Sequence, residues 1–170
     1  MNEFDEVMNR NLSQPISATL SAENAVERKW DFIIVGAGIA GSSMACILAE
    51  SGHRVLLIDK DAFPRHKTCG GTLNPRTVQS LKNLGLLGTV ENLSPNQIDG
   101  VDWQTSSKTK GQVDFSGDQK ALAVSRKNLD AALVQKAIRS GVDFLPHTRC
   151  INTDENPNQI TLRVRAQSIE

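Results

Sequence analysis

The chain has 170 residues, of which 19 are basic and 19 acidic, so its formal net charge is zero. This balance gives no support for nucleic-acid binding, because proteins that bind nucleic acids usually carry a basic excess. Hydrophobic residues make up 39% of the chain and charged residues 22%, which predicts one globular domain with a real core.

Three cysteines, Cys46, Cys69 and Cys150, lie far apart in the sequence. Their spacing matches no zinc motif, and an odd number argues against a closed set of disulfides. We therefore expect no metal site and a reducing, cytoplasmic setting. No stretch approaches the ~20 apolar residues that a membrane helix needs. Residues 1–29, rich in Ser, Asn and Glu, are expected to form a mobile polar extension.

The first predicted elements are a strand, a tight turn, a helix and a second strand within residues 31–60. The run Phe32–Val35 is continuously apolar, which is typical of a parallel strand buried on both faces. Apolar residues recur at helical spacing over residues 39–51, and Gly52 provides a helix stop. Val55–Ile58 repeats the pattern of a buried strand. Together these segments predict one right-handed βαβ unit.

A glycine motif occupies the turn between the first strand and the helix. Residues 36–41 read GAGIAG, a G-x-G-x-x-G in the context that dinucleotide binding requires. Gly36 permits the tight turn, Gly38 lets the main chain approach a pyrophosphate, and Gly41 lets helix and strand pack closely. The helix N-terminus supplies free N–H groups and the positive end of its dipole. The predicted cofactor-binding residues in this unit are Gly36, Ala37, Gly38, Ile39, Ala40, Gly41, Asp59 and Lys60.

Asp59 closes the second strand and narrows the choice of ligand. A carboxylate there accepts hydrogen bonds from the adenosine ribose hydroxyls and disfavours a 2′-phosphate, so NADP is the poorer candidate. NAD and FAD both use this fingerprint, and the motif alone does not decide between them. The competing interpretation is a glycine-rich turn that only packs well, with Asp59 as an ordinary strand-end carboxylate.

The next loop, residues 63–71, reads FPRHKTCGG. Arg65 and Lys67 would neutralise a pyrophosphate or hold an anionic flavin, and Gly70 and Gly71 would leave room for a flat ring system. The loop therefore favours FAD over an NAD-dependent dehydrogenase. A bland surface turn is the competing account.

Cys69 lies in the same loop. Its neighbours Lys67 and His66 would lower the pKa of its thiol. No second cysteine stands within a CxxC spacing, so we assign no catalytic role to Cys69.

The rest of the chain predicts more helices and an antiparallel section. Asn74 caps a helix that begins at Pro75. Alternation and glycines between residues 98 and 124 predict short antiparallel strands. A helix over residues 126–140 follows, and then further strands. The last strand, residues 160–164, has no terminator or closing helix after it, so we expect a domain that is incomplete at its C-terminus.

Arg126 is a further candidate ligand. Ser125, Arg126 and Lys127 put two cations in the first turn of a helix, where the helix dipole prefers anions, at a cost of a few tenths of a kcal/mol each. A bound phosphate would turn this free-energy cost into a favourable interaction. The alternative is two solvated bases that tolerate a small penalty.

Over residues 30–165 the chain resembles the FAD-dependent geranylgeranyl reductase family, within the wider para-hydroxybenzoate-hydroxylase-like flavoproteins. The resemblance rests on the glycine turn with its acid, on a P-R-x-K-x-C-G-G loop before a Pro-initiated helix, and on SRKNLDAAL, which is similar to the family's R-x-x-L-D-x-x-L helix. It implies an α/β, Rossmann-like FAD/NAD(P)-binding domain at residues 30–170, with a parallel sheet and a small antiparallel β section. Further cofactor-binding residues implied by loop and helix are Arg65, Lys67, Cys69, Gly70, Gly71 and Arg126.

The resemblance also implies a reaction class. Members bind FAD, are reduced by NAD(P)H, and act on small molecules such as isoprenoids or aromatics, either saturating a double bond or activating oxygen. Their later Asp-Gly and Gly-Asp motifs are missing here, which predicts the N-terminal part of a longer enzyme. The alternative is a truncated, non-catalytic dinucleotide-binding module. No catalytic acid or base can be named from these residues.

Overall fold

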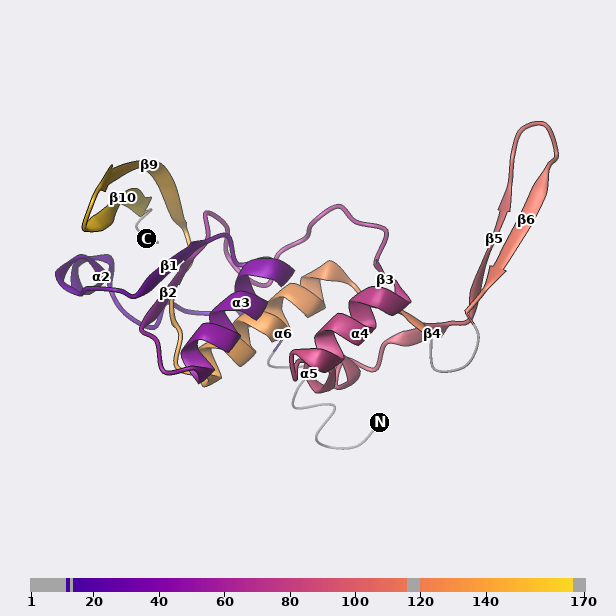
Figure 1. Ribbon diagram of the computed structural model, residues 1–170, viewed down its shortest axis with the longest axis horizontal. Helices are drawn as coiled ribbons and strands as arrows, with labels where there is room; N and C mark the ends of the chain where they lie inside the picture. The colour runs from indigo at the N-terminus through magenta and orange to yellow at the C-terminus, as the bar shows by residue number, and fades with distance from the viewer. Residues whose placement is uncertain (1–11, 13, 116–119, 167–170) are drawn as a thin grey trace.

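The computed structural model describes residues 12, 14–115 and 120–166. Over those residues the parallel sheet lies at one end, an antiparallel hairpin projects at the other end, and most of the helices lie between them (Figure 1). The elements are α2 (Ala22–Glu27), β1 (Phe32–Val35), α3 (Ile39–Glu50), β2 (Val55–Ile58), β3 (Thr72–Leu73), α4 (Pro75–Asn83), α5 (Leu87–Glu91), β4 (Asn96–Ile98), β5 (Gly100–Gln104), β6 (Lys110–Asp114), β7 (Ala121–Ala123), α6 (Arg126–Arg139), β8 (Asp143–Leu145), β9 (Thr148–Asn156) and β10 (Gln159–Ala166).

The parallel sheet confirms the predicted βαβ unit. Its strand order is β1-β2-β8, with Ile33 beside Leu56 and Leu57 beside Phe144. Every residue of the central strand β2 is buried, as its sequence predicts. The prediction that β1 is buried on both faces is wrong, because Val35 is 54% exposed and its neighbours are also partly open. Strand β1 pairs only with β2 among the described strands, so an apolar run here marks the edge of the sheet.

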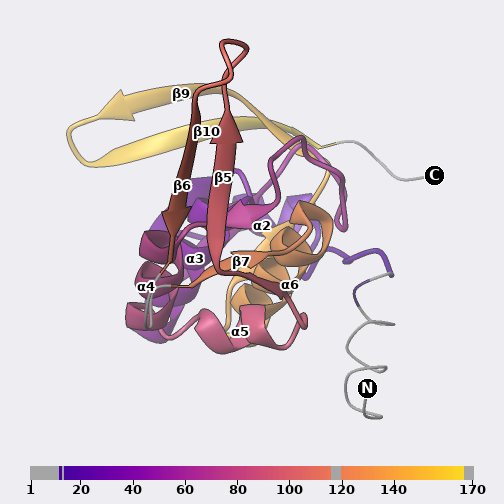
Figure 2. The same cartoon turned by 90° about the vertical axis from the view of Figure 1, so that its right-hand side faces the viewer.

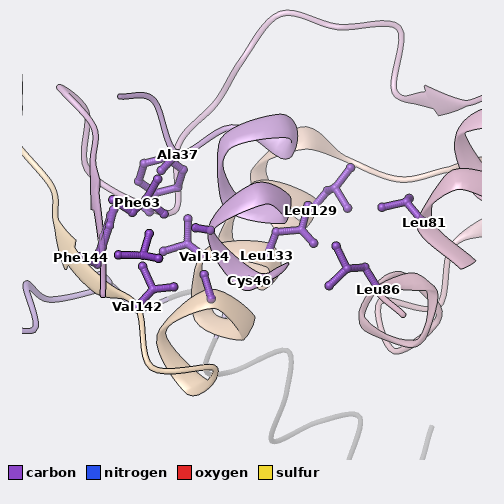
Figure 3. Packing of buried hydrophobic residues seen from close by; sticks show 14 of the residues in the cluster. Ala37, Cys46, Phe63, Leu81, Leu86, Leu129, Leu133, Val134, Val142 and Phe144 are labelled. Atoms are coloured by element: carbon purple, nitrogen blue, oxygen red, sulfur yellow. The ribbon is translucent and has the colours of Figure 1, made fainter. Parts of the chain in front are cut away.

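One hydrophobic core joins this sheet to the helices. Helices α3 and α6 lie against each other beside the strands (Figure 1). Phe63 and Phe144 meet edge to face with ring centroids 5.8 Å apart, and Leu129 and Leu133 of α6 are fully buried (Figure 3). Each such side chain contributes about 1.5–3 kcal/mol by leaving water. The core therefore fixes α6 against α3, whose N-terminus follows the carboxyl end of β1.

Antiparallel strands are confirmed within the predicted residues 98–124, and a further antiparallel hairpin follows later in the chain. Strands β3, β7 and β4 form one sheet, β5 and β6 form a projecting hairpin, and β9 and β10 form another (Figures 1 and 2). Helix α4 begins at Pro75, and the N–H of Thr77 donates to Oδ1 of its cap Asn74 at 2.8 Å. Local turn chemistry therefore sets this boundary where the sequence placed it.

The described part of the expected extension, residues 12 and 14–29, packs against the domain. Leu12 is only 3% exposed, and the N–H of Ile16 donates to the carbonyl of Phe63 at 2.8 Å. The N–H of Thr19 donates to the carbonyl of Phe144 at 3.0 Å. The sequence prediction rested on the polar composition of this segment, which does not reveal the few apolar residues that pack against the domain. Residues 1–11 and 13 lie outside the described residues.

Among the described helices, none is both long enough and apolar enough to cross a membrane.

Candidate functional site

The glycine turn leaves the first N–H groups of α3 without a side-chain cap. Gly36 has a φ of +104°, a region that favours glycine, and its N–H donates to the carbonyl of Ile58 at 2.7 Å. The helix then begins after Gly38, whose lack of a side chain means that no cap hydrogen bond forms. Uncapped N–H groups and the positive dipole end together form an anion site of the kind that binds phosphate.

Gly38 and Gly41 face different neighbours. A Cβ atom on Gly38 would lie 3.6 Å from Nη2 of Arg126 and 3.9 Å from Nη2 of Arg65, on the open side of the turn. A Cβ atom on Gly41 would lie 1.9 Å from the carbonyl oxygen of Gly36, inside the helix–strand contact. Gly38 therefore keeps the approach to two guanidinium groups clear, and Gly41 lets the helix pack closely against the strand.

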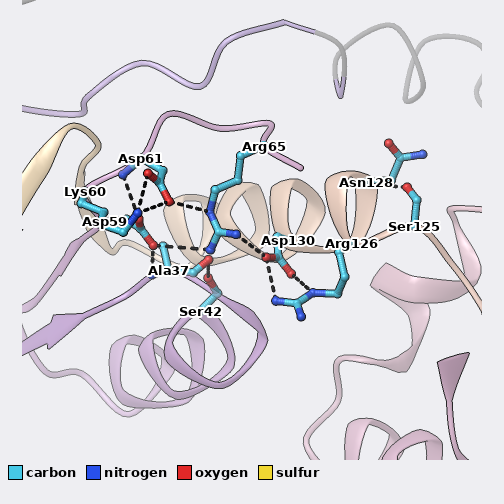
Figure 4. Close-up of polar contacts among 10 residues, drawn as sticks. All are labelled: Ala37, Ser42, Asp59, Lys60, Asp61, Arg65, Ser125, Arg126, Asn128 and Asp130. Atoms are coloured by element: carbon cyan, nitrogen blue, oxygen red, sulfur yellow. Dashed lines mark hydrogen bonds and ion pairs between the residues drawn. The ribbon is translucent and has the colours of Figure 1, made fainter. Parts of the chain in front are cut away.

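Asp59 ties the turn to strand β2. Its Oδ2 accepts from the N–H of Ala37 at 2.7 Å, and its Oδ1 accepts from the N–H of Asp61 at 2.9 Å (Figure 4). The side chain is almost fully buried but still lines the cleft. A carboxylate has about four lone-pair positions, so ribose hydroxyls could still donate to it. The structural role of Asp59 was not predicted from the sequence.

Two arginines meet one buried carboxylate beside the turn. Arg126 donates from Nε and Nη2 to the two carboxylate oxygens of Asp130, at 2.7 and 2.9 Å. Arg65 reaches the same carboxylate with Nη1 at 3.4 Å, and its Nη2 lies 3.7 Å from Oδ2 of Asp59 (Figure 4). The hydrogen bonds from Arg126 to Asp130 raise the pKa of Arg126, so its positive charge is secure. The structure thus places Arg65 and Arg126, which come from distant segments, side by side.

A cleft of about 860 Å³ brings most of the predicted residues together. This volume lies within the ~300–1,000 Å³ of small-molecule sites. Its lining consists of Val35, Gly36, Gly38, Ile39, Ala40, Gly41, Asp59, Lys60, Asp61, Arg65, His66, Lys67, Arg126, Thr148, Arg149 and Cys150.

Four predicted residues lie outside that lining. Ala37 is fully buried beneath the turn, and Cys69 is exposed in the loop beside Arg126. Gly70 has open space around it, and Gly71 adopts a φ of +71° while its carbonyl accepts from Val124. The loop therefore extends away from the turn, towards the neighbouring β3 and β7 strands.

The start of β9 adds lining residues that sequence reasoning missed. Arg149 and Cys150 reach the cleft because β8 runs parallel to β2 and delivers the chain to the same sheet edge. Cys150 is only partly buried, and it also packs against the buried cluster around Leu56 and Ile58. The ion pair between Arg126 and Asp130 could have been predicted from the sequence, because Asp130 follows Arg126 by four residues, the spacing of a helical ion pair.

Cys69 is activated by groups other than those expected. The main cause of its lowered pKa is the backbone N–H of Gly71, followed by a hydrogen bond from Arg126. Lys67 and His66, the neighbours in sequence, are not among the causes. Burial has the opposite effect on Cys46, where it raises the pKa of the thiol.

We predict that iodoacetamide modifies Cys69 well before Cys46. The thiolate is the reactive form, and only Cys69 combines exposure with a lowered pKa. Peptide mass spectrometry of the native chain between pH 7 and 9 measures both rates, with Arg126→Gln expected to shift the Cys69 profile to higher pH. Equal rates at the two cysteines would contradict this account.

Comparison with known proteins identifies the domain. The family model for the FAD binding domain matches residues 29–170. The chain belongs to this FAD-binding domain family. FAD is accordingly its cofactor, and the fold is that of the Rossmann-like flavoproteins. The observed site fits FAD, since an uncapped helix N-terminus, a bare Gly38 and two guanidinium groups face the cleft that a dinucleotide diphosphate would enter.

The relatives of this FAD-binding domain are longer proteins. An uncharacterized protein of Methanosarcina barkeri is 38% identical over 119 residues, which is 69% of this chain and 29% of that protein. A menaquinone reductase of Mycobacterium tuberculosis is 48% identical over 62 residues, which is 36% of this chain and 15% of that protein. The chain thus spans less than a third of the length of these relatives.

Solved structures give the same fold. The myxobacterial chondrochloren halogenase CndH, an FAD-dependent halogenase, superposes with a TM-score of 0.71 at 29% identity. The match covers 81% of this chain and 33% of the halogenase. The FAD-binding domain described here therefore corresponds to about a third of such an enzyme.

Proposed function

We propose that this chain is the FAD-binding part of a longer flavin-dependent reductase or monooxygenase of the geranylgeranyl-reductase-like group. The observation that carries this proposal is the open glycine turn with Arg65 and Arg126 on the side of Gly38. Two positive groups and an uncapped helix N-terminus suit a diphosphate with two negative charges. The short coverage of the longer relatives supports residues 30–170 as one portion of such an enzyme.

Each predicted residue has a role in this proposal. The N–H groups of residues 38–41 bind the diphosphate, with Arg65 and Arg126 beside it at Gly38. Asp59 accepts from the adenosine ribose, and Lys60 and Lys67 line the cleft as further cations. The loop through Cys69, Gly70 and Gly71 leads towards the flavin ring, where bare backbone gives a flat ring room to approach.

Bound FAD supplies hydride and oxygen chemistry that no side chain can perform. The protein binds it, orients it and sets the charge around its diphosphate. In the proposed enzyme, which we place in the cytoplasm, NAD(P)H reduces the flavin and a small isoprenoid or aromatic molecule is the substrate. The likeness to a menaquinone reductase supports the reductase arm of this proposal. A non-catalytic dinucleotide-binding module is the alternative.

The direct test is titration of the purified chain with FAD, followed by quenching of flavin fluorescence and by isothermal calorimetry. We expect saturable binding at one FAD per chain, and weaker binding of FMN, because FMN lacks the adenosine ribose and the diphosphate that this site contacts. NAD has both of these groups but lacks the flavin ring, so it should bind less tightly than FAD only to the extent that the loop through Gly70 and Gly71 contacts that ring. A folded chain that leaves FAD fluorescence unchanged would overturn the proposal. Binding without flavin reduction by NAD(P)H would favour the non-catalytic module for the chain by itself.

A further inference from the structure

Asp130 lies at the centre of the charged network beside the glycine turn. It belongs to α6, its side chain is fully buried, and both of its carboxylate oxygens face guanidinium groups. Arg126 takes the two oxygens in a bidentate pair, and Arg65 approaches from the other side at 3.4 Å (Figure 4). A carboxylate that holds two arginines at once fixes both the distance and the orientation between them.

The two arginines depend on Asp130 to different degrees. Arg65 also lies 3.7 Å from Asp59 and 3.7 Å from Asp61, and its guanidinium stands over the Phe63 ring at 4.7 Å. Among the described residues, Asp130 is the carboxylate that forms an ion pair with Arg126. Loss of Asp130 would therefore release Arg126 first.

Both guanidinium groups also remain open to a ligand. The ion pairs of Arg65 lie at 3.4–3.7 Å, longer than a charge-assisted hydrogen bond. The Nη2 atoms of both arginines are the atoms nearest to a Cβ placed on Gly38. They therefore face the point where the turn would meet an anion.

We propose that Asp130 is a positioning residue for the FAD diphosphate, acting through the guanidinium groups of Arg126 and Arg65 that it holds beside Gly38. This inference rests on the proposed function, since it concerns the same cofactor. Asp130 itself is fully buried and does not line the cleft. Its effect on the cofactor must pass through the arginines.

The direction of the change in FAD affinity distinguishes a positioning role of Asp130 from a purely electrostatic one. Asp130 is an anion near a site for an anionic ligand, so by charge alone its neutralisation would strengthen FAD binding. A positioning role predicts the opposite, because two guanidinium groups lose their common anchor. The Asp130→Asn variant keeps the size of the side chain and removes the charge. We expect its FAD affinity to fall about tenfold, the effect of one lost hydrogen bond to a charged group.

A matched control removes another carboxylate that joins the same two helices. Glu50 of α3 accepts from Lys136 of α6 and from Ser140, the C-cap of α6, at a place outside the cleft lining. Glu50→Gln should leave the FAD dissociation constant within about twofold of the wild type. Circular dichroism of each variant without FAD shows whether the protein is folded at the titration temperature.

A double-mutant cycle with Arg126→Gln tests whether Asp130 acts through Arg126. We expect the double variant to lose less affinity than the product of the two single losses. The double variant has neither the carboxylate nor the guanidinium of this ion pair, so no unpaired charge of the pair is buried. It therefore remains informative if Asp130→Asn does not fold. Arg126→Lys, which keeps the charge but cannot pair with both carboxylate oxygens, should also bind FAD more weakly.

Three outcomes would overturn the proposal: unchanged or tighter FAD binding by folded Asp130→Asn, fully multiplicative losses in the double variant, or wild-type affinity in Arg126→Lys. If the wild-type chain itself fails to bind FAD, the proposed function fails instead. The two failures are therefore distinguishable in one set of titrations.

Discussion

Replacing Gly38 by valine is expected to abolish FAD binding while the fold remains intact. A Cβ atom at this position would make ordinary contacts of 3.6 and 3.9 Å with Arg126 and Arg65. The valine branches, however, would fill the space between the guanidinium groups and the turn. A diphosphate that loses two charge-assisted hydrogen bonds, each about 1.5–3 kcal/mol, binds at least about 100-fold more weakly.

The fold should tolerate this change because the obstructed space is open. Gly38 has a φ of −77°, which any L-residue adopts, and it caps α3 without a side-chain hydrogen bond. The expected cost in unfolding free energy is about 1 kcal/mol, since valine is a poor N-cap residue. Flavin fluorescence titration and thermal unfolding measure the two effects separately.

Gly88→Val in α5 is the matched control, because no atom lies within 4 Å of a Cβ there and the residue is not part of the cleft lining. It should bind FAD like the wild type. Full FAD occupancy in Gly38→Val would contradict the placement of the diphosphate against this turn, and with it the proposed function.

Local signals in the sequence predict the elements that form the site. The apolar run of β2 and the helix cap Asn74 depend only on a few neighbouring residues, and the structure places them as expected. The exposure of β1 was not predictable in this way. An apolar strand has the same periodicity in the middle of a sheet and at its edge, and only the strand order separates the two positions.

The candidate site shows the same division. The glycine turn, Asp59 and the two arginines follow from motif and charge, because their chemistry is visible in single residues. Their arrangement is not visible, since it depends on how α6 packs against α3. Arg149 was missed because its position depends on the pairing of β8 with β2. The effect of Arg126 on Cys69 was missed because 57 residues of sequence separate the two side chains.

The packed N-terminal segment gives a third example. Composition averages over a window, and residues 1–29 are polar on average. Leu12 and Ile16, four residues apart, nevertheless pack against the same buried cluster. A few buried apolar contacts and backbone hydrogen bonds are enough to hold a polar segment in place, and an average cannot detect them.

Replacing Gly41 by alanine is expected to damage the fold itself. An added Cβ atom would lie 1.9 Å from the carbonyl oxygen of Gly36 and 3.3 Å from Cγ2 of Ile34. The first neighbour is backbone, so it cannot move by rotating a side chain. Helix α3 would have to shift away from β1, with loss of core packing. Overpacking usually costs about 1–3 kcal/mol, and we expect a loss at the upper end of that range.

A loss of about 3 kcal/mol should lower Tm by about 6–12 °C for a domain of this size. Scanning calorimetry of the chain without FAD measures it, with Gly88→Ala as the control, since an alanine there meets open space and suits a helix. Saturating FAD should restore part of the lost Tm only if the turn can still close around the diphosphate. An unchanged Tm in Gly41→Ala would mean that α3 does not approach the turn as closely as the site requires. The Gly38 and Gly41 variants therefore separate the two functions of the motif, since one should lose the ligand and the other the support beneath it.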